Sequence, residues 1–381
     1  MSAFAITRRA AVVAAAALLG ACSIIPRGPR TPPPVTQPTP EAGTGTLPAD
    51  QQRHRVALLV PMTGTNAAVG QSIANATTMA LLDTNAANLR ITTYDTGPGA
   101  REAARKALAD GNRLVLGPLM GGEIAAVTAL TRPARVPVIS FSNDSTLASG
   151  DAFVMGQLPQ QSIARTVRYA RGQGAQSFAV LAPEGDYGRL AEAALRQAVV
   201  RHGGRVAAVE TYARGNTSVV SAAQRLKARG GFDSVLIADG GRLAAQGAAQ
   251  LRPGTARILG TELWSGEATI ARAPALTGAM FAAVPDARYK RFFDSYQARF
   301  GGAPHRVATL GYDAVLLTLR VARDWRPGQA FPIARLRDPG GFSGLDGAFR
   351  FGADGVVERA MEVRQVRAGG VAVVDPAPTS F

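Results

Sequence analysis

Val56-Ala57-Leu58-Leu59-Val60-Pro61 is a run of five apolar residues that ends at a proline. Such a run is typical of a strand that is buried on both faces of a sheet, and proline ends it because it has no backbone N–H to donate. The segment 72–83 then places apolar residues at helical spacing. A buried strand followed by an amphipathic helix is the repeating unit of a parallel sheet covered by helices.

The same unit recurs in two series along the chain. In the first series we expect strands and helices to alternate over 56–60, 72–83, 90–94, 101–109, 113–116, 123–130 and 136–140. In the second series we expect helices and strands to alternate over 162–172, 177–181, 187–202, 205–212, 217–228, 234–238, 242–250 and 258–260. Two long helices and three strands should follow at 286–300, 307–325, 348–351, 360–366 and 371–374. Two α/β series of similar length predict two Rossmann-like lobes with parallel central sheets.

The first 21 residues have the features of a secretory signal peptide. Arg8 and Arg9 precede an apolar run, 10–19, that is too short to span a membrane, because a span needs about 20 helical residues. Cys22, the only cysteine, follows small residues, and this pattern resembles the lipobox of bacterial lipoproteins. We therefore predict a signal peptide over 1–21 and lipidation of Cys22. A plain secretory signal with an incidental cysteine is the alternative, and both Sec and twin-arginine export fit.

The segment 22–54 is predicted to be a Pro-rich tether between the lipid anchor and the folded part. Its prolines occur among Thr, Gly and Gln, with too few apolar residues to offset the entropy of ordering. At about 3.1 Å per residue, an extended tether would reach roughly 90 Å. Ser23 rather than Asp follows the cysteine, which favours the periplasmic inner leaflet of the outer membrane.

The formal net charge of +15 suggests a nucleic-acid partner, but the pattern of basic residues argues against one. Arginine is spread along the whole chain, and no basic run is interleaved with aromatic residues. His54, His202 and His305 are too scattered for a metal site, so no metal or cofactor is expected. The Gly-x-Ser-x-Gly, P-loop and His-Glu-x-x-His motifs are absent. We therefore expect a non-enzymatic protein.

Six short motifs follow one another along the chain: Val60-Pro61-Met62-Thr63-Gly64 with Gly70, Leu116-Gly117-Pro118-Leu119, Pro137-Val138-Ile139-Ser140, Glu184-Gly185-Asp186-Tyr187-Gly188, Gly311-Tyr312-Asp313-Ala314, and the segment 342–351. In this order they resemble type I periplasmic binding proteins of the leucine/isoleucine/valine class. The resemblance implies one such domain over 55–375. Its first lobe would comprise about 55–158 and 286–340, and its second lobe about 159–285 and 341–375. A three-strand hinge would join the lobes, which close on a ligand.

Four further segments are similar to those of a narrower group: Ser140-Phe141-Ser142-Asn143-Asp144, Gly260-Thr261-Glu262-Leu263-Trp264, Ala303-Pro304-His305, and 374–381. They look like segments of penicillin-binding protein activators, which are envelope lipoproteins. This resemblance implies a regulator of peptidoglycan synthesis whose partner is a penicillin-binding protein or peptidoglycan synthase. The alternative is an ABC-transporter substrate-binding protein for branched-chain or related amino acids, whose partner is an ABC permease.

The resemblance also implies a ligand-binding cleft beyond the carboxyl ends of the parallel strands. Glu262 falls where the family has the acid for the ammonium group of an amino-acid-like ligand. The family's carboxylate-binding serine falls near Gly121 or Gly122, so that hydroxyl is missing here. Its threonine partner falls near Asp144, whose charge would repel a ligand carboxylate.

Aromatic and acidic candidates in this cleft each have a structural alternative. Tyr187 and Trp264 would either clamp an apolar or sugar surface or pack between the lobes. Glu262 and Asp144 could instead be solvated or helix-capping acids. The cleft candidates are Thr63, Gly121, Gly122, Ser142, Asn143, Asp144, Tyr187, Glu262 and Trp264.

Overall fold

The first lobe is built on a five-stranded parallel sheet. The computed structural model describes residues 52–214, 218–252, 254 and 256–381. The strand order is β2-β1-β3-β4-β5, and every pair of neighbours is parallel. Leu58 in β1 pairs with Thr93 on one side and with Leu116 on the other, so the apolar run lies inside the sheet. The bounds are β1 (His54–Val60), β2 (Leu89–Asp95), β3 (Leu114–Leu116), β4 (Val138–Ser140) and β5 (Ala152–Val154).

Helices cover both faces of this sheet, which explains why the apolar run in β1 is continuous. Leu58 belongs to a buried cluster that includes residues of α2 and α11, whereas Leu59 belongs to a cluster that includes residues of α3 and α4. Successive side chains of a strand point to opposite faces, so both faces of β1 must be apolar. The bounds are α2 (Ala67–Asp83), α3 (Ala100–Ala109), α4 (Ile124–Thr131) and α11 (Thr309–Ala322).

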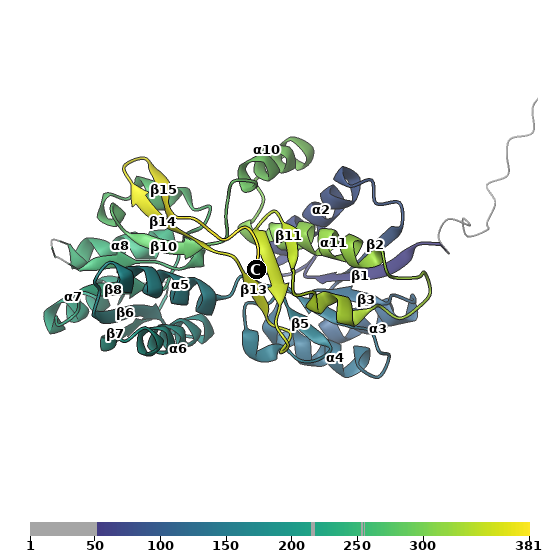
Figure 1. Ribbon diagram of the computed structural model, residues 1–381, viewed down its shortest axis with the longest axis horizontal. Coiled ribbons are helices and arrows are strands. Elements are labelled where there is room, and N and C mark those ends of the chain that lie inside the picture. The colour runs from purple at the N-terminus through teal and green to yellow at the C-terminus, as the bar shows by residue number, and fades with distance from the viewer. Residues whose placement is uncertain (1–51, 215–217, 253, 255) are drawn as a thin grey trace, which may run out of the picture. The chain divides into compact units, whose positions relative to one another are not determined.

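The second lobe is built on a seven-stranded sheet with the order β15-β14-β10-β9-β8-β6-β7. Strands β6 to β10 are parallel, and β14 and β15 add an antiparallel edge. Helices α5 and α6 pack on one face, and α7 and α8 pack on the other (Figure 1). The strand bounds are β6 (Ser177–Pro183), β7 (Arg205–Tyr212), β8 (Ser234–Ile237), β9 (Arg257–Leu259), β10 (Met280–Ala283), β14 (Glu362–Arg367) and β15 (Gly370–Asp375). The helix bounds are α5 (Pro159–Gly172), α6 (Asp186–Arg201), α7 (Ser218–Arg229), α8 (Gly241–Leu251) and α9 (Ala268–Arg272).

A small third sheet, β11 (Phe342–Gly344), β12 (Gly347–Phe351) and β13 (Val357–Arg359), belongs to the first lobe. Phe342, Phe349 and Phe351 lie in the buried cluster of that lobe, and Val356 bridges to Val154 of β5. The expected second-lobe segment 341–375 is therefore wrong for 341–359, because its aromatic side chains complete the first-lobe core. Only β14 and β15 join the second lobe.

Three segments cross between the lobes, at 155–158, 284–288 and 360–361. The first two agree with the sequence expectation, and the third lies nearly twenty residues beyond the expected crossing at 341. Helix α10 (Tyr289–Phe300) follows the second crossing and packs on Ala76 and Met79 of α2. The α/β fold with two lobes and a three-segment hinge is confirmed.

Short elements and the ends of the chain complete the description. The 3-10 helices are Gly121–Glu123, Ser145–Leu147, Glu262–Trp264, Pro274–Leu276, Arg306–Ala308 and Ile333–Arg337. Within the described ranges, no helix combines the length and the apolar character needed to cross a membrane. The predicted signal peptide, the lipidation of Cys22 and the tether up to residue 51 lie outside the described residues.

Candidate functional site

A cavity of about 630 Å³ lies beside the carboxyl ends of the strands. Loops after β1, β3, β4 and β9 reach it, as does the start of α11, so its walls come from both lobes. This is where doubly wound folds bind ligands. Its lining residues are Asn66, Val69, Leu119, Met120, Gly121, Phe141, Asn143, Gln157, Glu262, Leu263, Ser265, His305, Arg306, Val307 and Leu310.

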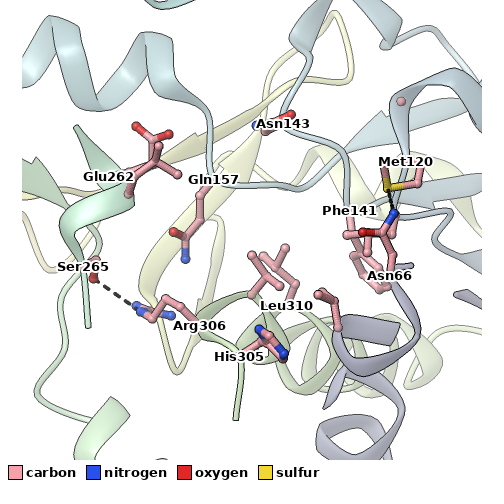
Figure 2. Close-up of a pocket in the computed structure, with 15 residues that line it drawn as sticks. Asn66, Met120, Phe141, Asn143, Gln157, Glu262, Ser265, His305, Arg306 and Leu310 are labelled. Carbon is pink, nitrogen blue, oxygen red and sulfur yellow. Dashed lines mark hydrogen bonds between the residues drawn. The ribbon is translucent and has the colours of Figure 1, made fainter. Parts of the chain in front are cut away.

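The two ends of the cavity differ in chemistry (Figure 2). Met120 and Phe141 lie together at one end, with Asn66 beside them. Gln157 and Arg306 lie toward the other end, together with Ser265 and Glu262. A ligand that fills this space would meet apolar side chains over its body and polar side chains at one end, as is usual for small-molecule sites.

Three of the sequence candidates line the cavity, namely Gly121, Asn143 and Glu262. Thr63 donates its hydroxyl to Asp95 at 2.7 Å, and this bond holds the loop after β1. Ser142 is buried, and its Oγ accepts a hydrogen bond from the backbone N–H of Asp144 at 3.1 Å. These candidates therefore shape the loops of the first lobe rather than face the cavity.

Asp144, Gly122 and Trp264 also lie outside the lining set. Asp144 accepts a hydrogen bond from the backbone N–H of Thr146 at 2.9 Å and so caps a 3-10 helix, which was the structural alternative. Trp264 is 1% exposed, and its Nε1 donates to the Asp239 carbonyl at 2.9 Å. Its indole packs inside the second lobe and does not line the cavity.

Glu262 begins a 3-10 helix after β9, and its carboxylate is held by its own lobe. The Tyr187 hydroxyl donates to Oε1 at 2.9 Å, while Oε2 is buried and has no hydrogen-bond partner among the described residues. Burial raises the pKa of Glu262 to about 7, although the Tyr187 hydrogen bond opposes this rise. Tyr187 therefore hydrogen-bonds to Glu262 and does not line the cavity.

The raised pKa of Glu262 predicts that the protein loses stability as the pH rises from about 4.5 to about 7. The folded state holds the Glu262 proton more tightly than the unfolded state does, so ionisation above the unfolded pKa costs folding free energy. In Glu262→Gln, this pH-dependent decrease in the free energy of unfolding should be smaller by on the order of 2 kcal/mol. Urea unfolding at pH 5 and pH 8 measures it, with exposed Glu184→Gln as the control. An unchanged pH slope in Glu262→Gln would contradict the prediction.

Arg306 is a largely buried cation at the polar end of the cavity. Its side chain is 13% exposed, and Nη1 lies 2.9 Å from Oδ1 of the fully buried Asp346. Nε lies 3.4 Å from Ser265 Oγ, and the guanidinium stacks 4.4 Å above the centre of the Tyr289 ring. Nη2 has no hydrogen-bond acceptor in the part of the chain that the structure describes. Arg306 therefore touches both lobes and keeps one donor group unused.

Asp346 connects Arg306 to the hinge. Its Oδ2 accepts hydrogen bonds from Gln157 Nε2 at 3.0 Å and from the Thr309 hydroxyl at 2.9 Å. Burial opposes ionisation of Asp346, but the charges of Arg306 and Arg359 outweigh it and lower its pKa. Asp346 thus contacts Gln157 of the first crossing and interacts with Arg359 at the end of β13. The polar end of the cavity is therefore continuous with the hinge.

Arg306, Gln157 and Ser265 were missed by sequence reasoning. One available signal was the position of Arg306 at the start of a helical segment, directly after Ala303-Pro304-His305. A cation is unfavourable at a helix N-terminus, where the backbone dipoles are positive, so an arginine there indicates another role. Gln157 and Ser265 have no comparable signal, because only the crossing geometry brings them to Arg306.

Two lobes, three crossings and a cavity at their strand ends define a two-lobed ligand-binding protein. The sequence model of the family described as "Periplasmic binding protein" matches residues 54–371. The chain therefore belongs to the periplasmic binding protein family, whose members bind ligands and work in the periplasm. The resemblance to the type I class is confirmed.

Two solved structures share this fold, and one further protein is similar in sequence. LivJ of Streptococcus pneumoniae, solved with isoleucine, is 21% identical, with a TM-score of 0.66 over 86% of this chain and 100% of LivJ. A solute-binding protein of an ABC transporter from Rhodopseudomonas palustris BisB5, solved with 3,4-dihydroxybenzoic acid, is 20% identical. Its TM-score is 0.69, and the match covers 87% of this chain and 97% of that protein. "Uncharacterized protein RP748" of Rickettsia prowazekii is 26% identical over 168 residues, which span 43% of this chain and 44% of that protein.

Proposed function

We propose that this chain is the substrate-binding component of an ABC transporter and closes its lobes on a small amino-acid-like or related carboxylate ligand. The observation that carries this proposal is the cavity at the strand ends, which both lobes line and to which the first crossing contributes Gln157. A ligand that contacts both walls favours the closed arrangement of the lobes. The ligands solved with the structural relatives, isoleucine and 3,4-dihydroxybenzoic acid, are both small carboxylates and support this class.

Protein purified from its native envelope should carry a small molecule, because a closed binding protein releases its ligand slowly. Mass spectrometry of the material released on denaturation should identify one acidic compound per chain. Returning that compound to the refolded, emptied protein should raise its melting temperature, since binding to the native state alone stabilises it. Recovery of no compound, together with no melting shift on adding envelope extract, would contradict the proposal.

A second candidate function is activation of a penicillin-binding protein through protein contact. The observation in its favour is that the groups expected to bind an amino acid are incomplete. Gly121 and Gly122 lack the expected hydroxyl, and the Glu262 carboxylate is hydrogen-bonded to Tyr187. Lipidation of Cys22 and residence in the outer membrane would suit this role, because a tether could then reach a synthase across the periplasm. Cross-linking in intact envelopes discriminates the two, since transport requires an ABC permease as the captured partner and activation requires a peptidoglycan synthase.

A further inference from the structure

We propose that Arg306, assisted by Gln157 and Ser265, recognises the anionic group of the ligand at the hinge end of the cavity, and that the ligand is a carboxylate that needs no ammonium group. This inference rests on the proposed binding function and assigns the residues and ligand class of that same cavity. It differs from the expected arrangement, in which a first-lobe hydroxyl holds the carboxylate and Glu262 holds an ammonium group.

The first step is the state of the expected ammonium site. The Glu262 side chain lines the cavity, and its Oε1 accepts a hydrogen bond from the Tyr187 hydroxyl at 2.9 Å, while Oε2 is buried without a partner among the described residues. Burial raises the pKa of Glu262 to about 7, so much of this acid carries a proton near neutral pH. A buried, partly protonated acid that is already hydrogen-bonded offers little attraction to a ligand cation.

The second step is the state of the expected carboxylate site. Gly121 lines the cavity and Gly122 follows it, so neither position offers a side-chain donor. Nearby Ser142 cannot replace the hydroxyl, because it is 3% exposed and its Oγ serves the Asp144 backbone. The first lobe therefore presents no hydroxyl side chain among the cavity-lining residues that could fix a carboxylate.

The third step is the geometry of Arg306 itself. It lines the cavity from the 3-10 helix Arg306–Ala308, which precedes α11, and lies beside Gln157 of the first crossing and Ser265 of the second lobe (Figure 2). Its Nη1 and Nε have partners, but Nη2 is a buried donor without an acceptor in the described residues. An unpaired buried donor on a cation is costly, and a ligand carboxylate is the acceptor that a guanidinium binds best.

The fourth step is the balance of buried charge. Arg306 and Arg359 supply two guanidiniums that interact with the acids Asp346 and Asp313. Arg364 also contacts Ser265, but it is already paired with Glu362 and Asp286. Burial and repulsion by Asp346 raise the pKa of Asp313. When Asp313 keeps its proton, Arg306 and Arg359 face the single carboxylate of Asp346, so an incoming anion at Arg306 is attracted by the remaining positive charge. A buried cluster of this kind selects an anionic ligand.

The test uses the full chain and a matched set of probes with one branched apolar body. L-leucine carries both charges, 4-methylpentanoate carries only the carboxylate, and 3-methylbutylamine carries only the ammonium group; benzoate tests an aromatic body. Calorimetry and melting temperature report binding of each probe. The variants are Arg306→Lys, which keeps a cation beside Asp346, and Arg306→Gln with Asp346→Asn, which removes both members of the pair.

Arg337→Gln is the matched control, because Arg337 also stacks on an aromatic ring, 4.9 Å from the centre of Phe153, but does not line the cavity. We expect a carboxylate probe to bind without an ammonium group and 3-methylbutylamine not to bind. Arg306→Lys should weaken carboxylate binding about 10-fold and the paired variant about 30-fold or more, because the Nη2 donor of the guanidinium is lost.

Three results decide the matter. Binding of L-leucine without binding of 4-methylpentanoate or benzoate would overturn this inference and leave the proposed transport function intact. Unchanged carboxylate affinity in the folded paired variant would also overturn the role of Arg306 and leave the proposed transport function intact. Absence of binding by all four probes would overturn both the inference and the proposed amino-acid-like ligand class.

Discussion

Gly188→Ala is expected to lower the free energy of unfolding of the second lobe by about 3 kcal/mol. A Cβ at Gly188 would lie 1.7 Å from the Pro183 carbonyl oxygen, so helix α6 must move away from the end of β6. Gly70 shows the same close approach in the first lobe, where a Cβ would lie 1.8 Å from the Pro61 oxygen. In each lobe, the helix that follows the first strand thus packs against the proline that ends this strand.

The two tryptophans allow this effect to be measured lobe by lobe. Trp264 lies in the core of the second lobe and Trp325 in the core of the first. In a Trp325→Phe background, urea unfolding followed by fluorescence should show a lower midpoint for Gly188→Ala. In a Trp264→Phe background, it should show a lower midpoint for Gly70→Ala. Equal midpoints with and without the alanine would contradict the close approach.

Gly172→Ala supplies the control for this prediction. Gly172 ends helix α5 in the second lobe, and a Cβ there would meet no atom within 4 Å. Alanine has a higher helix propensity than glycine by about 1 kcal/mol in a helix interior, so the control should be neutral or slightly more stable. A loss in Gly172→Ala equal to that in Gly188→Ala would show that the effect is not steric.

The sheets were predictable from sequence because their signals are local. Continuous apolar strands such as 56–60 and 177–181 face helices on both sides, and the intervening helices have clear apolar faces. Strands β5 and β10 were missed, since three or four small and apolar residues resemble a buried helix segment as much as a strand. The third crossing was misplaced because pairing of β11–β13 with the first-lobe core is a long-range property.

The site was less predictable than the fold, for a physical reason. The resemblance indicated Glu262, which does line the cavity, but the sequence could not show that Tyr187 occupies its carboxylate. Arg306 is one of many scattered arginines, and its position at the start of a helical segment does not show that it pairs with Asp346. Polar groups that contact one another at the hinge come from distant segments of the chain. Periodicity and spacing are local patterns and do not predict such contacts.

Arg359→Met is expected to destabilise the protein by about 3–5 kcal/mol, because it removes one member of a buried charge cluster. Arg359 is 6% exposed, and its Nη2 donates to the Met155 carbonyl at 2.7 Å, which ties the end of β13 to the first crossing. Its charge also helps to lower the pKa of Asp346. Methionine keeps most of the apolar volume over the Phe349 ring, so the loss reports the charge and the hydrogen bond.

Two further variants separate charge from packing in this cluster. Arg350→Met is the control: Arg350 pairs with Glu358 on the surface of the same small sheet, with side chains 37% and 48% exposed, and should cost less than about 1 kcal/mol. Adding Asp313→Asn to Arg359→Met removes one acid with the lost cation and leaves the Arg306–Asp346 pair intact. Urea unfolding at pH 8, above the pKa of about 7 to which burial raises Asp313, should then show recovery of at least half of the lost stability, since uncompensated buried charge is the costly element. If the double variant is no more stable than Arg359→Met, the lost stability comes from the Met155 hydrogen bond and not from unpaired charge.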